Sequence, residues 1–456
     1  MRTKDEYIGK RYETKCVDSS FEGKGVCFVE DFVIFVSSML PGDVGTIEIS
    51  YKRNGVYFGK LASLSKLSPW RIKPRCPIAS ACGGCVYQSL SYEKEKELKR
   101  ELVVHQLERA HIECDVLSCD GLEEPYHYRN KIQVPFGKDK NGNLIYGFYR
   151  EKTHEIIPFE DCPIDDPRAV LILHKLLPIL REFRIEGYDE KKKEGNLRHA
   201  LIRTAIGHPN IQVTLVLRED VISGNSLLIA KIQEEIPEIT TLYININKKD
   251  TNVILGDRFF LVYGPKYLKE TLNGMTFLIS PNSFFQVNSK MAEILYKTAI
   301  DFADIQSDEV VFDAYSGTGA IGLFAALQGA KKVLAVEVVP EAVRDALENA
   351  KNNSIKNYSA VVGDATEVMV EMAHRKEKID VLFMDPPRKG STLKFLNAVL
   401  SLKPKKIVYV SCNPITLVRD LVTLKDEYDI KKVKALDLFG RTIHVETVVL
   451  LSRKNG

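Results

Sequence analysis

Residues 309–327 read EVVFDAYSGTGAIGLFAAL, which predicts an apolar strand, a turn containing Gly317, Gly319 and Gly322, and then a helix of small apolar residues. A strand that ends in a glycine turn and continues as a helix is typical of nucleotide-binding α/β folds. In such folds ligands lie at the carboxyl ends of parallel strands. The turn alone is weak support for a nucleotide site, because most glycine triplets are ordinary turns.

Acidic residues end the strands that follow. The stretch KKVLAVE ends in Glu337, whose carboxylate can accept hydrogen bonds from both hydroxyls of a ribose. The next predicted strand ends in VVGDA, where Asp364 can accept from an adenine amino group, and IDVLFMDPPRKG brings Asp385 to the end of a fourth strand. The glycine turn has no basic partner to clamp a phosphate. The pattern therefore favours S-adenosylmethionine, with its adenosine and cationic sulfonium, over a dinucleotide.

A cysteine ends the next apolar strand. Residues 407–414 read IVYVSCNP and are followed by a predicted helix, ITLVRDLVTL, whose positive end is expected to lower the pKa of the Cys412 thiol. A thiolate is suited to conjugate addition at C6 of a uracil, which makes C5 nucleophilic. After C5 takes an electrophilic carbon, a nearby carboxylate must remove its proton. Glu446 lies in the alternating stretch RTIHVETVVLL, where an acid would ordinarily face solvent.

The block from FFQVNS to HVET resembles the RNA (uracil-5-)-methyltransferase family, in particular its 23S ribosomal RNA branch, and the resemblance extends over nearly the whole chain. It implies methyl transfer from S-adenosylmethionine to C5 of a uridine, with Cys412 as nucleophile and Glu446 as proton acceptor. It also implies a Rossmann-like catalytic sheet whose last strand is inserted antiparallel. Ala320 departs from relatives that have an asparagine there. The implied cofactor-binding residues are Gln286, Tyr315, Gly317, Gly319, Glu337, Asp364 and Asp385.

The chain has nine cysteines, an odd number that argues against a disulfide framework and for a reducing, cytoplasmic compartment. Cys76, Cys82 and Cys85 share the short stretch RCPIASACGGCVYQ, and Cys162 in FEDCPID can supply a fourth sulfur from a distant segment. The spacing predicts a metal site and leaves zinc as an alternative. The family resemblance favours a 4Fe-4S cluster of structural role.

The length of 456 residues predicts about three domains. Residues 1–68 alternate apolar and polar positions between turn signals, which predicts a small oligonucleotide-binding-type barrel whose placement resembles a TRAM domain. Residues 69–275 are expected to form a central α+β iron-sulfur and RNA-binding domain, with a helix near 90–112 that packs on the catalytic part. Residues 276–456 are expected to form the methyltransferase domain. The overall class is α/β.

The net charge is only +3, so RNA binding must depend on local basic patches. Arg129 and Lys131 lie beside aromatic residues in predicted central strands, and Arg198 and Arg203 are candidates for contacts with the RNA backbone. No apolar run approaches a membrane span, and neither membrane nor DNA is an expected partner.

The expected partner is 23S ribosomal RNA, with the target uridine in a loop or single-stranded segment. Two alternatives stay open. One is the same reaction on the T-loop uridine of transfer RNA, whose bacterial enzymes, by family resemblance, generally lack the barrel and the cysteine cluster. The other is a non-catalytic iron-sulfur protein that binds RNA.

Overall fold

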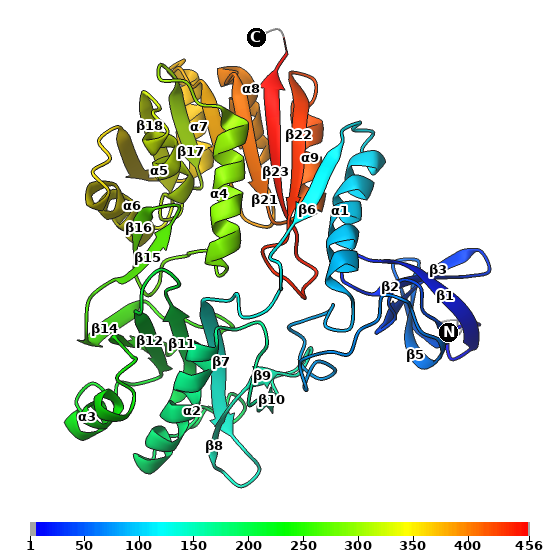
Figure 1. The fold of residues 1–456 in the computed structure, drawn as a ribbon, viewed down its shortest axis with the longest axis vertical. Helices are drawn as coiled ribbons and strands as arrows, with labels where there is room; N and C mark the ends of the chain where they lie inside the picture. Colours follow the sequence, from blue (N-terminus) through cyan, green and yellow to red (C-terminus); the bar gives the residue numbers. More distant parts are fainter. Residues whose placement is uncertain (1–5, 455–456) are drawn as a thin grey trace.

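The computed structural model describes residues 6–454 and contains a small barrel, a central sheet and a larger C-terminal sheet (Figure 1). The mixed α/β architecture with an N-terminal five-stranded barrel is as predicted. Among the residues described, no helix is both long and apolar enough to cross a membrane.

The N-terminal barrel closes in the strand order β1-β2-β3-β5-β4. Its strands alternate in burial, so that one side chain in two points into a core that includes Cys16, Cys27, Ile34 and Ile47. Cys16 and Cys27 are therefore core residues rather than ligands. The strands are β1 (Arg11–Ser19), β2 (Gly25–Val29), β3 (Phe32–Ser37), β4 (Val44–Arg53) and β5 (Val56–Lys66).

The central part is a six-stranded sheet in the order β14-β13-β12-β11-β7-β8. Helices α2 and α3 pack on one face of it through an aliphatic core. The elements are β7 (Lys131–Lys138), β8 (Leu144–Tyr146), α2 (Pro167–Glu182), β11 (Leu197–Thr204), β12 (Ile211–Leu217), α3 (Ser226–Glu235), β13 (Thr241–Ile246) and β14 (Arg258–Tyr263).

Two short hairpins complete the connections. In one, Asn273 and Gly274 both have positive φ, the conformation that a two-residue turn between twisted strands requires. The hairpin strands are β9 (Phe148–Tyr149) with β10 (Ile156–Ile157), and β15 (Leu268–Leu272) with β16 (Met275–Ile279).

The C-terminal sheet has eight strands in the order β19-β18-β17-β20-β21-β23-β22-β6. The strands from β19 to β21 are mutually parallel, whereas β23 is antiparallel to both of its neighbours, as predicted for the last strand. The strands are β6 (Val116–Asp120), β17 (Val310–Ala314), β18 (Lys332–Glu337), β19 (Tyr358–Val362), β20 (Val381–Met384), β21 (Lys406–Ser411), β22 (Tyr428–Leu436) and β23 (Glu446–Arg453).

Helices cover both faces of this sheet, because alternate residues of its buried strands point to two separate cores. One core is built with α4 (Ser289–Ala303), α5 (Ala320–Leu327) and α6 (Pro340–Asn352). The other is built with α1 (Tyr92–Arg109), α7 (Ala365–His374), α8 (Leu393–Leu402) and α9 (Pro414–Leu424).

Helix α1 and strand β6 precede the central sheet in the sequence but belong to this C-terminal layer. Val103 and Leu107 of α1 lie in the same core as Tyr409 of β21 and Leu421 of α9. β6 extends the sheet by pairing in parallel with β22. The chain therefore enters the catalytic layer before it builds the central sheet.

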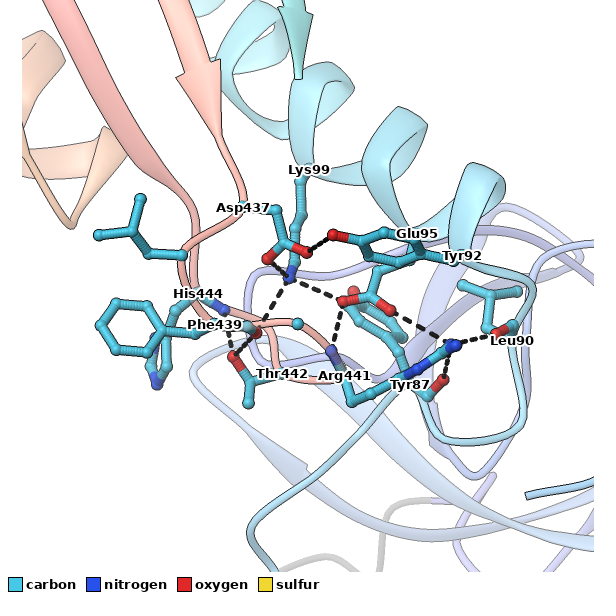
Figure 2. Close-up of polar contacts among 12 residues, drawn as sticks. Tyr87, Leu90, Tyr92, Glu95, Lys99, Asp437, Phe439, Arg441, Thr442 and His444 are labelled. Carbon is cyan, nitrogen blue, oxygen red and sulfur yellow. Dashed lines mark hydrogen bonds and ion pairs between the residues drawn. The ribbon is translucent and has the colours of Figure 1, made fainter. Parts of the chain in front are cut away.

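A buried ion cluster fastens α1 to the loop between β22 and β23 (Figure 2). Lys99 Nζ donates to Asp437 Oδ1 at 2.6 Å and to Glu95 Oε1 at 2.8 Å. The backbone N–H of Arg441 donates to the same Glu95 oxygen, and the Arg441 guanidinium donates to the carbonyl of Leu90. Burial opposes the charge of Lys99, but Asp437 and Glu95 outweigh that effect and raise its pKa.

Replacing Lys99 by methionine is expected to lower the free energy of unfolding by about 3–5 kcal/mol. Asp437 would stay buried without a cation, and Glu95 would keep only the longer ionic contact with Arg441 at 3.5 Å. Lys297→Met is a matched control, since Lys297 forms an exposed pair with Asp301 one turn away, and it should change stability by less than about 0.5 kcal/mol. Urea titration followed by circular dichroism measures both. Equal, small effects of the two substitutions would contradict a stabilising role for the cluster.

Candidate active site

The glycine turn after β17 needs its glycines for different reasons. Gly317 and Gly319 have φ of +55° and +84°, in the left-handed region. A Cβ on Gly319 would lie 2.5 Å from the Tyr358 hydroxyl, whereas the position of a Cβ on Gly317 is open space. Tyr315 also has positive φ, which is uncommon outside glycine and points to a constrained site. The turn therefore presents backbone to an open region in front of α5.

Carboxylates from two neighbouring strands flank this turn. Glu337, at the end of β18, accepts hydrogen bonds from the backbone N–H groups of Gly317 at 3.0 Å and Val339 at 2.9 Å. Asp364 is exposed and caps α7 by accepting from Thr366 N at 2.8 Å and Glu367 N at 3.2 Å. The two side chains are held by local backbone donors, so their oxygen atoms have fixed positions at the carboxyl edge of the sheet.

Two further predicted cofactor residues are Tyr315, in the turn itself, and Gln286, in the loop before α4. The Tyr315 ring packs against Phe395, with ring centroids 5.5 Å apart, and its hydroxyl lies 3.4 Å from Ser391 Oγ. Gln286 is almost fully buried in the loop before α4, and its backbone carbonyl accepts from Asn130 Nδ2 at 3.0 Å. That bond joins the loop to the central domain, which faces the carboxyl ends of the parallel strands in Figure 1.

Cys412 and Glu446 come together through the pairing of β21 with β23. Ser411 is the last residue of β21 and pairs with Thr447, so the antiparallel register continues with Cys412 opposite Glu446. Cys412 is half-buried and Glu446 is 4% exposed. The strand order thus brings together two residues that the family resemblance assigns to one uracil ring.

The loop after Cys412 is tied to the loop after β20. Asn413 Nδ2 and Thr416 Oγ1 both donate to the carbonyl oxygen of Arg388, at 3.0 and 3.1 Å. Asn413 Oδ1 accepts from Ile415 N and so caps α9. These contacts bring the segment of Asp385 and Arg388 against the thiol.

Burial governs the protonation of the site. It raises the pKa of Asp385 to about 7, and together with the charge of Asp385 it raises the pKa of Glu446 well above the usual range. Burial, Glu446 and Asp385 raise the pKa of the Cys412 thiol to about 11, although Arg388 acts in the opposite direction. The expectation that the α9 terminus leaves this thiol with a lowered pKa is therefore wrong, because desolvation and two neighbouring carboxyl groups outweigh it.

His444 and Asp313 are features of the site that the sequence did not reveal. Arg388 Nη2 donates to His444 Nε2 at 3.2 Å, and burial with the charge of Arg388 lowers the pKa of His444 to about 4. The imidazole is thus neutral at physiological pH and accepts from the guanidinium. Asp313 is buried beneath the glycine turn, accepts from Gly322 N at 2.9 Å, and has its pKa raised to about 8 by burial. The two-residue spacing from His444 to Glu446 was the available signal for the histidine.

Three of the four predicted cluster cysteines share one neighbourhood. Burial, together with the neighbouring Cys82 and Cys76, raises the pKa of the Cys85 thiol to about 11. Cys82 forms an isolated bridge with Arg150. Cys162 lies on a separate loop, and the adjacent Asp161 acts on Cys76. Within residues 6–454, no three cysteine, histidine or acidic side chains are arranged as metal ligands.

Comparison with known proteins gives the following relations. Residues 91–454 match the family described as tRNA (uracil-5-)-methyltransferase. An uncharacterized RNA methyltransferase of Halalkalibacterium halodurans is 39% identical over 446 residues, covering 97% of each chain. One of Oceanobacillus iheyensis is 39% identical over 441 residues, covering 96% of this chain and 95% of that protein.

A solved structure is also similar over nearly the whole chain. It is the Pyrococcus abyssi tRNA (uracil-54, C5)-methyltransferase in complex with S-adenosyl-L-homocysteine. Its TM-score is 0.78 at 27% identity, with 96% of this chain and all of that chain covered.

Replacing Asp385 by asparagine is expected to raise the alkylation rate of Cys412 by iodoacetamide several-fold at pH 8, because losing a carboxylate lowers the pKa of the thiol. Mass spectrometry of the Cys412 peptide gives the rate. Asp364→Asn is the matched control, since Asp364 lies at the same edge but is not among the groups that shift this pKa. An unchanged or slower rate in the Asp385 variant would show that the carboxylate does not act on the thiol.

Proposed function

Since this chain belongs to the tRNA (uracil-5-)-methyltransferase family and is an S-adenosylmethionine-dependent RNA uracil-5-methyltransferase, we propose that its substrate is a uridine of 23S ribosomal RNA. The target lies in a loop or single-stranded segment, where a base leaves its stack at low cost. The reaction takes place in the cytoplasm, the compartment that the unpaired thiols favour.

The placement of Cys412 beside Glu446, one residue beyond the Ser411–Thr447 pair, carries the catalytic proposal. The Cys412 thiolate forms a bond to C6 of the uracil, and the electron pair of the C5–C6 double bond moves toward C5 and O4. C5 would then take the methyl group that bound S-adenosylmethionine supplies, with the electron pair of the broken S–CH3 bond left on the sulfur of a neutral thioether. Glu446 removes the C5 proton, and loss of the thiolate from C6 restores the double bond. A thiol and a carboxyl on opposite strands can reach C6 and C5 of one ring.

Arg388 has a defined electrostatic role in this proposal. It is the cation that opposes the raised pKa of both Cys412 and Glu446. Its contact with neutral His444 fixes the guanidinium beside the pair. Arg388 therefore favours the thiolate needed for addition and the carboxylate needed for proton removal, while Asp385 or Arg388 orients the uracil edge.

The cofactor pocket is proposed at the glycine turn. The open space before Gly317 and the fixed Glu337 carboxylate fit an adenosine moiety, and Asp364 is available to its amino group. When bound, S-adenosylmethionine supplies an electrophilic methyl group and a positive charge. The residues proposed to bind it are Gln286, Tyr315, Gly317, Gly319, Glu337, Asp364 and Asp385.

Transfer RNA is the second candidate substrate, and a specific observation favours it. The Pyrococcus abyssi relative, named for uracil 54 of tRNA, matches this chain over 96% of its length, including the N-terminal part. The barrel therefore does not by itself separate the two RNA classes. The resemblance of the motifs to the ribosomal branch favours 23S ribosomal RNA.

Mapping of 5-methyluridine in RNA from a strain that lacks the gene distinguishes these candidates. We expect one or more 5-methyluridines to disappear from 23S ribosomal RNA while those of transfer RNA stay. Loss of the T-loop modification alone would reject the ribosomal assignment and support the alternative.

Cys412→Ala and Glu446→Gln should fail at different steps. The cysteine variant should form no covalent RNA complex and no product, because it lacks the nucleophile. The glutamate variant should add and methylate but retain the RNA, because its C5 proton is not removed. Denaturing gel electrophoresis with labelled RNA shows the complex, and Ser411→Ala is a nearby control expected to turn over. A covalent complex in the Cys412 variant would overturn the assignment.

The second site proposed is a 4Fe-4S cluster on Cys76, Cys82, Cys85 and Cys162. Its support is the shared neighbourhood of three half-buried thiols, with the Asp161–Cys162 loop next to Cys76. The four thiolates would hold the cluster, which would brace the segment ahead of α1. Its role is structural, since the methyl transfer requires no electron.

Anaerobically purified protein should contain iron and acid-labile sulfide in equal amounts, and Cys85→Ser should lose both. Cys114→Ser is the control, because Cys114 lies outside the four-cysteine set and should leave the content unchanged. Zinc without sulfide would reject the cluster in favour of a four-thiolate zinc site.

A further inference from the structure

A row of polar side chains crosses the central sheet. Lys131 of β7, Arg203 of β11 and Gln212 of β12 are direct cross-strand partners, because Arg203 pairs with Lys131 on one side and with Gln212 on the other. The residues next to them in sequence, such as Ile132 and Ile202, belong to the core beneath α2 and α3. Since side chains alternate along a strand, the row points to the opposite face.

Each side chain of this row has a nitrogen atom without a hydrogen-bond partner. Arg203 is 5% exposed and Gln212 is 2% exposed, yet Arg203 Nη1 and Gln212 Nε2 have no hydrogen-bond partner. The Lys131 ammonium has neither a hydrogen bond nor an ion pair with any residue in the described range 6–454. Leaving the buried donors of Arg203 and Gln212 unpaired is costly. Together with the partly buried Lys131 ammonium they point to a ligand that accepts hydrogen bonds.

Positive charges outnumber negative ones around this row. Burial and the charges of Arg203 and Arg129 lower the pKa of Lys131 to about 7, as expected where cations are held together. Arg129 is 3.5 Å from Asp165, and Asp345 acts on Arg203, but no carboxylate pairs with Lys131. A ligand with several acceptor oxygens and a negative charge would satisfy the donors and relieve the repulsion.

The row adjoins the active site. Arg203 Nη2 donates to the carbonyl of Ser283 at 3.0 Å, which fixes the guanidinium against the loop that leads to Gln286. Asn130 N donates to Val287 O at 2.7 Å, so the start of β7 is bound to the same loop. Phe284 on this loop is 65% exposed. Arg129, next to the row, lies close enough to His444 of the active site for its charge to lower the pKa of that histidine.

We infer that Lys131, Arg203 and Gln212 form a binding site for a backbone phosphate of the RNA, next to the nucleotide whose base enters the active site. The inference rests on the RNA methylation described above. A phosphodiester supplies the acceptor oxygens and the negative charge, and it positions the strand without reading its sequence. This site therefore sets how RNA is held, whichever uridine is modified.

Steady-state methyl transfer to unfractionated RNA from a strain lacking the gene tests the site, with Lys131→Gln and Gln212→Leu as variants. The KM for RNA should rise roughly tenfold in Lys131→Gln, as expected for loss of a charged hydrogen bond, while kcat is unchanged. The slope of log KM against log salt should become shallower by about 0.7, the value for one phosphate contact on a single strand. Lys131→Arg should restore most of the affinity.

The thermal unfolding midpoint separates an RNA-binding role of Lys131 from a purely structural one. If Lys131 binds RNA, its replacement by glutamine relieves repulsion among cations and should keep or raise the midpoint. Lys332→Gln is the control, since Lys332 is exposed at the amino end of β18, away from the site. Unchanged KM and salt slope in both row variants, or a fall in the unfolding midpoint with unchanged RNA affinity, would overturn the inference. Methylation of transfer RNA alone would reject only the ribosomal assignment, because the phosphate contact is independent of RNA class.

Discussion

The buried contact between Lys99 and Asp437 joins residues 338 positions apart, and the arrangement of the active site depends on it. Asp437 begins the loop that leads to His444 and Glu446, while Lys99 belongs to a helix that precedes the central sheet in the chain. Arg441 in the same loop exchanges hydrogen bonds with the segment of Tyr87 and Leu90, just after the cysteine loop (Figure 2). A single cluster thus connects the cysteine loop, α1 and the loop before the proposed base. Because each charge is buried, removing one of them would leave its partners uncompensated in an apolar core.

The same low-dielectric surroundings determine the chemistry of the site. Burial shifts Asp385, Glu446 and Cys412 toward their neutral forms. The charge of Asp385 adds to this effect at Glu446, and the charges of both carboxylates add to it at Cys412. Such a group of acids is unfavourable for stability at neutral pH, and its retention is typical of functional sites. The positive charge of Arg388 opposes this shift at Cys412 and Glu446. Its position depends on the neutral His444, which would repel the guanidinium if it were protonated. A cationic cofactor beside these carboxyl groups would shift all three toward their ionised forms. The site is therefore suited to become reactive only when it is occupied.

Much of the catalytic fold could be predicted from sequence because its signals are local. The glycine turn at 315–319, the acids that end β18 and β20, and the alternating barrel strands each occupy a few adjacent residues. What the sequence did not reveal depends on contacts between distant segments. The addition of β6 to the edge of the sheet and the row from Lys131 to Gln212 both follow from strand order and register. The thiol pKa was predicted in the wrong direction because burial cannot be read from a helix start.

In the proposed mechanism Cys412 forms a bond to C6 of a uracil, and Glu446 then removes the proton from C5. RNA in which the target carries 5-fluorouridine tests it directly, because fluorine at C5 cannot be removed as a proton and the addition product persists. After incubation with S-adenosylmethionine and digestion, mass spectrometry should find a methylated 5-fluorouridine nucleotide attached to the peptide that contains Cys412. Attachment to another residue, or methylation of control RNA without any trapped complex on the fluorinated RNA, would contradict the account.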